Sequence, residues 1–267
     1  MLANYITEDT PVITINNLKL AEAQQLAQQL KIDKHTLAEK NNWVSLKNQW
    51  YYFKKDDPRI DGSINELIGQ YITKHFGLTP VFHQIGKFEN DNQWPITEYG
   101  LLSKNFRDPN KIYHRIKKGP DKNYPITYLD HLQKYKELSE DLKRLIIRDL
   151  YASETDRQYC NILIEQEKGS QDLRLAPIFD NELSLNVVRS RYSNFLFLID
   201  LNDPSVKAYM KKDPLFQELL DKVQSFSMKN VLNQIQETHH LKFTRGNREN
   251  WIHYDRDQKR NIYKKTR

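Results

Sequence analysis

Several features that define common protein classes are scarce or missing in this sequence. Cysteine occurs once in 267 residues, as Cys160, which excludes an internal disulfide and fits a reducing compartment. No apolar run approaches the roughly 18 residues that a membrane-spanning helix needs. The opening residues, MLANYITEDTPVITI, lack the basic segment and the continuous apolar segment of a signal peptide. We therefore expect a cytoplasmic protein without a transmembrane segment.

What the chain does have is a polar composition, many aromatic residues and a local excess of positive charge. Charged residues make up 28%, apolar residues 38% and aromatic residues 11%, a balance typical of a folded protein and not of a disordered one. Nine lysines and arginines stand against three acidic residues between Lys242 and Arg267, which accounts for the whole net charge of +6. Such a segment could contact nucleic acid, an acidic partner or a membrane surface. A solvated terminal helix or tail is the simpler interpretation, and we favour it.

The pattern of apolar residues predicts an α+β chain built from two unequal parts. In the first part, residues 1–105, we expect a strand at 11–15, a helix at 18–30, a strand pair at 43–46 and 50–53, a helix at 63–77, and strands at 80–86 and 99–102. Residues 104–128 are rich in Lys, Asn, Pro and Tyr and are predicted to form a loop. This loop is the predicted boundary between a small mixed part that contains a sheet and a mainly helical part, residues 106–267.

The second part is predicted to be helical except for one hairpin. The sequence SEDLKRLIIRDLYAS places its apolar residues on one face of a helix at 139–153. Two short apolar runs, at 162–164 and 173–179, flank a polar Lys-Gly turn and predict a hairpin. Asp213 and Pro214 have the residue types of an N-cap and a first helical position. Beyond them we expect helix up to the basic C-terminal segment.

The hairpin places two carboxylates and an amide at its two ends. Asp156 and Asn161 precede its first strand, and Asp180 follows its second. A carboxylate near a phosphate is repelled unless a divalent cation lies between them, and Mg²⁺ takes only a few protein oxygens. In kinase-type phosphoryl transfer one Asp orients the acceptor hydroxyl, while an Asn shortly after it and a second Asp hold the metal. The interval Asp156-x4-Asn161 has the spacing of a kinase catalytic loop.

A kinase also needs a lysine that binds the phosphates and a glutamate that orients this lysine. Lys54 lies at the end of the predicted strand WYYFK, and Glu66 lies near the start of the helix that follows. Each residue also has a plainer interpretation: Lys54 as a surface lysine at a strand end, and Glu66 as the partner of Ser63 in a helix capping box. All five residues occur in the order and in the elements that a kinase requires, which favours the kinase interpretation.

These segments resemble the HipA-like kinase family, whose members carry a DRHxxN-type loop and a LAPIYD or APIFD segment. The matching segments are DRQYCN at 156–161 and LRLAPIFDNELSL at 173–185, with WYYFKK and NELIGQYITKHFGL resembling the strand of the ATP-binding lysine and the helix after it. The layout is more distantly similar to phosphoinositide kinases. The resemblance spans residues 43–185 and implies a two-lobed protein-kinase-like fold. Gln158 stands where the family often has His, a change that we expect to be tolerated.

The resemblance implies an ATP-dependent serine/threonine kinase that uses Mg²⁺. By this resemblance the site residues would be Asp156 as catalytic base, Asn161 and Asp180 as metal ligands, Lys54 as the phosphate-binding lysine and Glu66 as its ion-pair partner. The segment LLSKNF, residues 101–106, would lie near the hinge that contacts adenine. Such kinases often act as toxins or effectors, so a protein substrate, autophosphorylation, a partner antitoxin and delivery to a host cell are further implications. The chain departs from typical kinases in one respect, because none of its eight glycines precedes Lys54 to form a glycine-rich phosphate loop.

Other interpretations stay open at this point. The same fold can carry lipid phosphorylation or adenylylation, because fold alone does not fix function. A pseudokinase or an antitoxin-like binding partner is a third class, against which the complete set of five residues argues. The segment LAEAQQLAQQLKIDKHTLAEK, residues 20–40, has a helix–turn–helix pattern and, with the basic C-terminal segment, is compatible with DNA binding. His239 and His240 lack the neighbouring ligands that a metal site needs.

Overall fold

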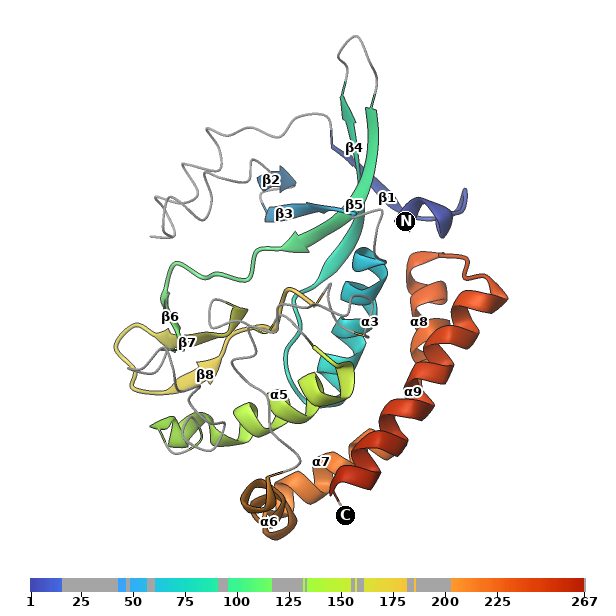
Figure 1. Ribbon diagram of the computed structural model, residues 1–267. Helices are drawn as coiled ribbons and strands as arrows, with labels where there is room; N and C mark the ends of the chain where they lie inside the picture. Colours follow the sequence, from blue (N-terminus) through green and yellow to red (C-terminus); the bar gives the residue numbers. More distant parts are fainter. Residues whose placement is uncertain are drawn as a thin grey trace.

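The computed structural model describes residues 1–15, 43–46, 49–56, 61–90, 96–116, 132, 134–154, 157, 161–181, 185 and 203–266. In these ranges the chain forms two β-sheets and a set of helices, with the larger sheet at one end of the molecule (Figure 1). The prediction of a mixed chain of helices and strands is confirmed. The two-lobed arrangement and the boundary between residues 105 and 106 stay predictions.

The larger sheet has five strands, and each strand segment expected in this part of the sequence is present. Their order is β1 (Val12–Ile15), β4 (His83–Asn90), β5 (Ile96–Lys104), β3 (Gln49–Lys55) and β2 (Trp43–Leu46). β1 runs parallel to β4, and the other neighbours are antiparallel. Aromatic residues, which suit a pleated and half-buried surface, dominate β3. Its Phe53 is fully buried in a small core with Ile15, Val44 and Leu102.

Helix α3 (Gly62–His75) lies beside this sheet and is buried along most of its length (Figure 1). Its buried apolar side chains recur at helical spacing and include Ile64, Leu67, Ile68 and Ile72. The helix ends before Gly77, whose φ of 77° is the left-handed conformation that glycine adopts readily at helix ends. The helix predicted at 63–77 is therefore confirmed, whereas the helix and the helix–turn–helix expected between residues 18 and 40 lie outside the described residues.

A second sheet carries the predicted hairpin. It consists of β6 (Lys111–Arg115), β7 (Leu163–Glu167) and β8 (Leu173–Leu175), all antiparallel in this order. β7 and β8 confirm the hairpin. β6 shows that the prediction of a loop over 104–128 is wrong for residues 111–115, because this short segment pairs with β7 and forms a cross-strand ion pair from Lys111 to Glu165 at 2.8 Å.

The other described helices and 3₁₀ turns lie both before and after the hairpin in the chain. They are α5 (Ser139–Ala152), α6 (Pro204–Lys212), α7 (Pro214–Ser225), α8 (Met228–His239) and α9 (Arg245–Thr266), with 3₁₀ turns η1 (Leu2–Asn4) and η2 (Lys136–Leu138). α5 confirms the amphipathic helix predicted at 139–153. One apolar core connects these helices with α3 and with residues of the larger sheet. Within the described parts of the chain, no helix is both long enough and apolar enough to span a bilayer.

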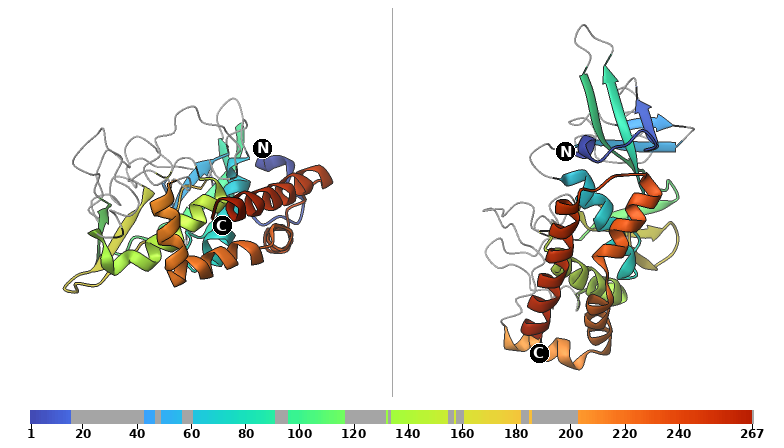
Figure 2. Two further views of the ribbon diagram at one scale, coloured as in Figure 1. Left: turned by 60° about the horizontal axis from the view of Figure 1, so that its bottom comes forward. Right: turned by 90° about the vertical axis from the view of Figure 1, so that its right-hand side faces the viewer.

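The C-terminal helices hold α3 on the side away from the sheet. α8 and α9 run side by side along the molecule (Figures 1 and 2), and α8 packs on α3. The ring of His75 lies 5.1 Å from the ring of Phe226, and its Nε2 lies 2.8 Å from the carbonyl oxygen of Lys222. α5 and α8 therefore both pack on α3, and its apolar side chains share one core with Ile85 and Leu101 of the sheet.

The basic C-terminal segment is a packed helix rather than a tail. α9 continues to Thr266, and its residues Trp251 and Ile262 are buried. The hydroxyl of Tyr151 in α5 donates to Oδ1 of Asp255 at 2.7 Å. The expectation that the helical region ends before a basic tail is therefore wrong, although the outward face of α9 carries exposed basic residues, as expected for a solvated helix.

Asp213 caps α7 and joins it to α5. Its Oδ1 accepts hydrogen bonds from the backbone N–H groups of Leu215 and Phe216, and Pro214 occupies the first turn, so the predicted helix start is confirmed. Its Oδ2 accepts from Nζ of Lys143 at 2.5 Å. Partial burial works against the charged form, but these hydrogen bonds outweigh it and lower the pKa of the Asp213 carboxyl.

We expect Asp213→Ala to lower the free energy of unfolding by about 1–3 kcal/mol, because it removes a helix cap and a charge-assisted hydrogen bond. Urea denaturation near neutral pH measures this loss, and Asp213→Asn, which keeps a capping side chain, should lose less. Because the pKa is lowered in the fold, the contribution is present above the ordinary pKa of aspartate and is lost as the pH falls through the lowered value. A loss of equal size in acid would contradict this account.

Candidate functional site

The candidate site is built around Lys54, which extends from β3 between two carboxylates. Its Nζ lies 3.2 Å from Oε1 of Glu66 and 2.7 Å from Oδ1 of Asp180. The side chain of Glu66 is 3% exposed, whereas that of Asp180 is 32% exposed. The lysine therefore connects a buried carboxylate to one that solvent can reach.

Glu66 faces this lysine and takes no part in capping its own helix. The N-cap of α3 is Asp61, which makes no side-chain capping bond, and Ser63 lies inside the helix. The capping-box interpretation is therefore wrong, and so is the interpretation of Lys54 as an unengaged surface lysine. Burial favours the protonated form of Glu66, but the positive charge of the nearby Lys54 outweighs it and holds the pKa of this carboxyl below its ordinary value.

Asn161 and Asp180 meet at the base of the hairpin, as the sequence predicts. Nδ2 of Asn161 donates to Oδ2 of Asp180 at 2.9 Å. The segment before Asp180 is tied to the segment before β4, because the backbone of Ile178 donates to the carbonyl of Thr79 and accepts from the N–H of Val81. Asp180 itself has a φ of 60°, a left-handed conformation that aspartate adopts more readily than most residues.

The predicted catalytic base, Asp156, lies outside the described residues, and so does Cys160. The next residue in the chain after Asp156, Arg157, is described and is buried. Its Nη1 donates to the carbonyl oxygen of Phe179 at 2.9 Å, directly before Asp180. Arg157 is thereby attached to the segment that carries Asp180.

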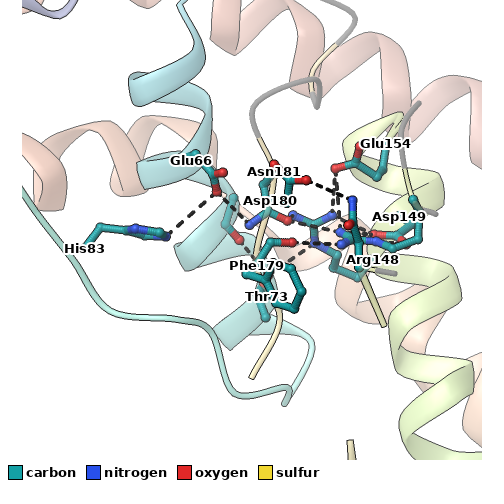
Figure 3. A network of polar contacts seen from close by, with 12 residues as sticks. Glu66, Thr73, His83, Arg148, Asp149, Glu154, Phe179, Asp180 and Asn181 are labelled. Atoms are coloured by element: carbon teal, nitrogen blue, oxygen red, sulfur yellow. Dashed lines mark hydrogen bonds and ion pairs between the residues drawn. The ribbon is translucent and has the colours of Figure 1, made fainter. Parts of the chain in front are cut away.

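A buried network of charged and polar side chains lies behind the site (Figure 3). Arg148 of α5 is fully buried and donates to Thr73, Asp149 and Asn181. Arg157 donates through Nε to Asp149 at 2.9 Å, and both arginines lie within 3.6 Å of the Glu154 carboxylate. In this network the two guanidinium groups are balanced by two carboxylates, which makes their burial tolerable.

His83 approaches Glu66 from β4 (Figure 3). Its Nε2 lies 3.8 Å from Oε2 of Glu66, and its Nδ1 lies 3.0 Å from Oγ of Ser103. Burial lowers the pKa of His83, which favours the neutral form of its ring. The positive charge next to Glu66 therefore comes from Lys54.

Four further residues of this site were not predicted from the sequence: Arg148, Arg157, Asn181 and His83. One signal could have revealed Arg148. It lies three residues after Leu145 and four before Ala152, both of which are buried, so its position is on the apolar face of α5. A charged residue on an apolar face must find partners inside the protein.

The side chains at the site suit a phosphate and a divalent cation. Asn161 and Asp180 supply a carboxamide and a carboxylate in contact with each other, and these are oxygen ligands of the kind that Mg²⁺ takes. Lys54 supplies a positive charge within the same group of side chains. The donor set therefore fits the metal that the sequence predicts.

The structure is similar, over most of the chain, to that of a known kinase. The crystal structure of the Helicobacter pylori proinflammatory kinase CtkA matches it with a TM-score of 0.59 and 13% sequence identity, over 84% of this chain and 91% of that chain. The fold is kinase-like. No protein-family model and no curated protein matches the sequence. The HipA-like family itself stays a prediction.

We expect Arg148→Ala to lower the free energy of unfolding by about 3–5 kcal/mol, because it leaves the buried carboxylate of Glu154 and the partly buried carboxylate of Asp149 with less compensating charge. Arg144 lies one turn earlier on α5 and pairs with the partly exposed Glu140 and Asp141, so Arg144→Ala should cost at most about 1 kcal/mol. Chemical denaturation of both variants measures the difference. Similar losses for the two would show that the buried network does not stabilise the fold.

Proposed function

We propose that this protein is an ATP-dependent kinase that transfers the γ-phosphate of Mg-ATP to a serine or threonine hydroxyl of a protein. One observation carries the proposal. In a kinase-like fold, Lys54 contacts both Glu66 and Asp180, and Asn161 contacts the other oxygen of Asp180. These are side chains of the kinds that bind phosphates and a metal ion in phosphoryl transfer, and they come from four separate segments of the chain.

Each described residue has a defined role in this proposal. Lys54 binds phosphate oxygens, and Glu66 keeps its ammonium group directed toward them. Asn161 and Asp180 hold Mg²⁺, which, when bound, neutralises charge on the phosphates. Asp156 orients the acceptor hydroxyl and accepts its proton. Its neighbour in the chain, Arg157, donates to the carbonyl of Phe179, directly before Asp180.

The adenine ring is proposed to lie near residues 101–106. This segment contains the end of β5, and the backbone N–H of Asn105 donates to the carbonyl of Trp50 on β3. The ring of Phe106 lies 5.8 Å from that of Phe179, one residue before Asp180. The segment thus approaches both the strand of Lys54 and the metal-binding segment.

The nature of the acceptor rests on the HipA-like resemblance. That resemblance supports a protein substrate, autophosphorylation and a role as a toxin or effector, either in the cytoplasm or in a host cell, with an antitoxin as a further partner. CtkA is described as a proinflammatory kinase, which supports an effector role for a chain of this fold. The chemistry of the site is the same for each of these acceptors.

Incubation with Mg²⁺ and ATP labelled in the γ position tests the proposal. We expect label in the protein itself or in a general protein acceptor, and we expect Asp180→Ala to reduce it by roughly a hundredfold or more, because the variant removes a metal ligand. Asp172→Ala is the matched control, since Asp172 is exposed on the same hairpin, and it should retain the wild-type rate.

A parallel reaction with label in the α position separates the alternatives. Transfer of α label would identify adenylylation in place of phosphorylation, and transfer only to an added phosphoinositide would identify a lipid kinase. No transfer of either label by the wild type, together with no increase in its melting temperature on addition of Mg-ATP, would overturn the proposal.

A further inference from the structure

We infer that Asn181 is a positioning residue that fixes Glu66 of α3 relative to the metal-binding segment. The catalytic role of Asn181 rests on the proposed function. The contacts of its side chain are present in the structure whatever the activity is. Asn181 directly follows Asp180 in the chain and is 1% exposed. Its side chain points away from solvent toward Glu66 and Arg148 (Figure 3).

The carboxamide of Asn181 satisfies three partners with opposite requirements. Its Nδ2 donates to Oε2 of Glu66 at 3.1 Å. Its Oδ1 accepts from Nη2 of Arg148 at 2.5 Å and from Nη2 of Arg157 at 3.1 Å. The two arginines therefore hold one end of the amide, and the other end holds the glutamate.

Only a carboxamide can make this connection at this size. An aspartate could accept from both arginines but would place a second carboxylate against Glu66, and an aliphatic side chain would leave buried polar groups without partners. Glu66 uses its other oxygen, Oε1, to pair with Lys54. Asn181 thus sets the position of the carboxylate that directs Lys54, while its backbone is joined to the residue that binds the metal.

Gly69 provides independent support for this role. It lies three residues after Glu66, so the two residues share one face of α3. A Cβ at Gly69 would lie 2.7 Å from Cβ of Asn181 and 3.1 Å from Nη2 of Arg148, which is too close for the present packing. Glycine is unfavourable inside a helix, and here its missing side chain provides the space through which Asn181 reaches Glu66.

Steady-state kinetics of Asn181→Asp test the positioning role. We expect the KM for Mg-ATP to rise by roughly tenfold, because Lys54 loses its fixed partner, while the KM for the hydroxyl acceptor changes by less than about twofold. A merely structural role would lower the active fraction and leave both KM values unchanged. Asn250→Asp, at an exposed position on α9, is the matched control and should behave as the wild type.

Gly69→Ala should raise the same KM, because the added methyl group displaces the same amide. Gly246→Ala is its control, since a Cβ there meets nothing within 4 Å. The double variant Gly69→Ala with Asn181→Asp should show no larger an effect on the KM than the stronger single variant, because both disturb one contact. Fully multiplicative effects would show that the two residues act separately.

A double-mutant cycle measured by thermal unfolding tests the hydrogen bond between Asn181 and Glu66 without ATP. Asn181→Asp should lower the melting temperature by about 3 °C or more, and Glu66→Gln should lower it in the wild type. In the Asn181→Asp background, however, Glu66→Gln should raise it, because the new amide can donate to the new carboxylate and restore the hydrogen bond with reversed polarity.

The kinetic measurements and the thermal-stability cycle together distinguish failure of the positioning role from failure of the proposed function. If the wild type transfers phosphate but Asn181→Asp has an unchanged KM for Mg-ATP, the positioning role is overturned and the kinase stands. If the wild type transfers no phosphate, the proposed function fails and the stability cycle alone judges the contact. A cycle in which Glu66→Gln destabilises both backgrounds equally would overturn the coupling between Asn181 and Glu66.

Discussion

A carboxylate that is buried in a protein must be compensated by positive charge or by hydrogen-bond donors, and the centre of this structure is arranged around that requirement at Glu66. Lys54 supplies the charge from β3, and Asn181 supplies a donor from the segment after β8. The charge of Lys54 outweighs the effect of burial and holds the pKa of this carboxyl below its ordinary value. Since Lys54 lies on a strand of the larger sheet and Asn181 lies after β8 of the second sheet, their contacts with one carboxylate bring the strand of the lysine, helix α3 and the segment of Asp180 together.

The surroundings of α3 hold Glu66 from several sides. The helix packs on α5 and α8, and His75 near its end contacts Lys222 and Phe226 at the end of α7. On the side of the site, Arg148 and Arg157 hold Asn181, and Arg157 also holds the backbone of Phe179. Groups that act on phosphates contribute most when they are fixed before the substrate arrives. The fold therefore uses its buried charges to preorganise the few side chains that solvent can reach.

The sequence predicted those site residues whose type and order along the chain are required by one known chemistry. Lys54, Glu66, Asn161 and Asp180 could be selected because kinase chemistry requires these residue types in this order, and the structure brings all four into contact. The strand β6 could not be predicted, because five residues of mixed polarity become a strand only through pairing with β7. The role of Asn181 could not be predicted either. It depends on contacts with Gly69 and with two arginines from distant segments, and an asparagine next to an aspartate does not indicate such contacts in the sequence.

Calorimetric titration of Mg-ATP into the wild-type chain and into Lys54→Met tests the central claim most directly, which is that this group of charges binds the phosphates of a nucleotide. Methionine keeps most of the length and apolar contact of the lysine and removes only its charge and its hydrogen bonds. The account predicts saturable binding to the wild type and a dissociation constant at least roughly tenfold larger for the variant. Equal affinity in the two proteins, or no binding to the wild type, would contradict it.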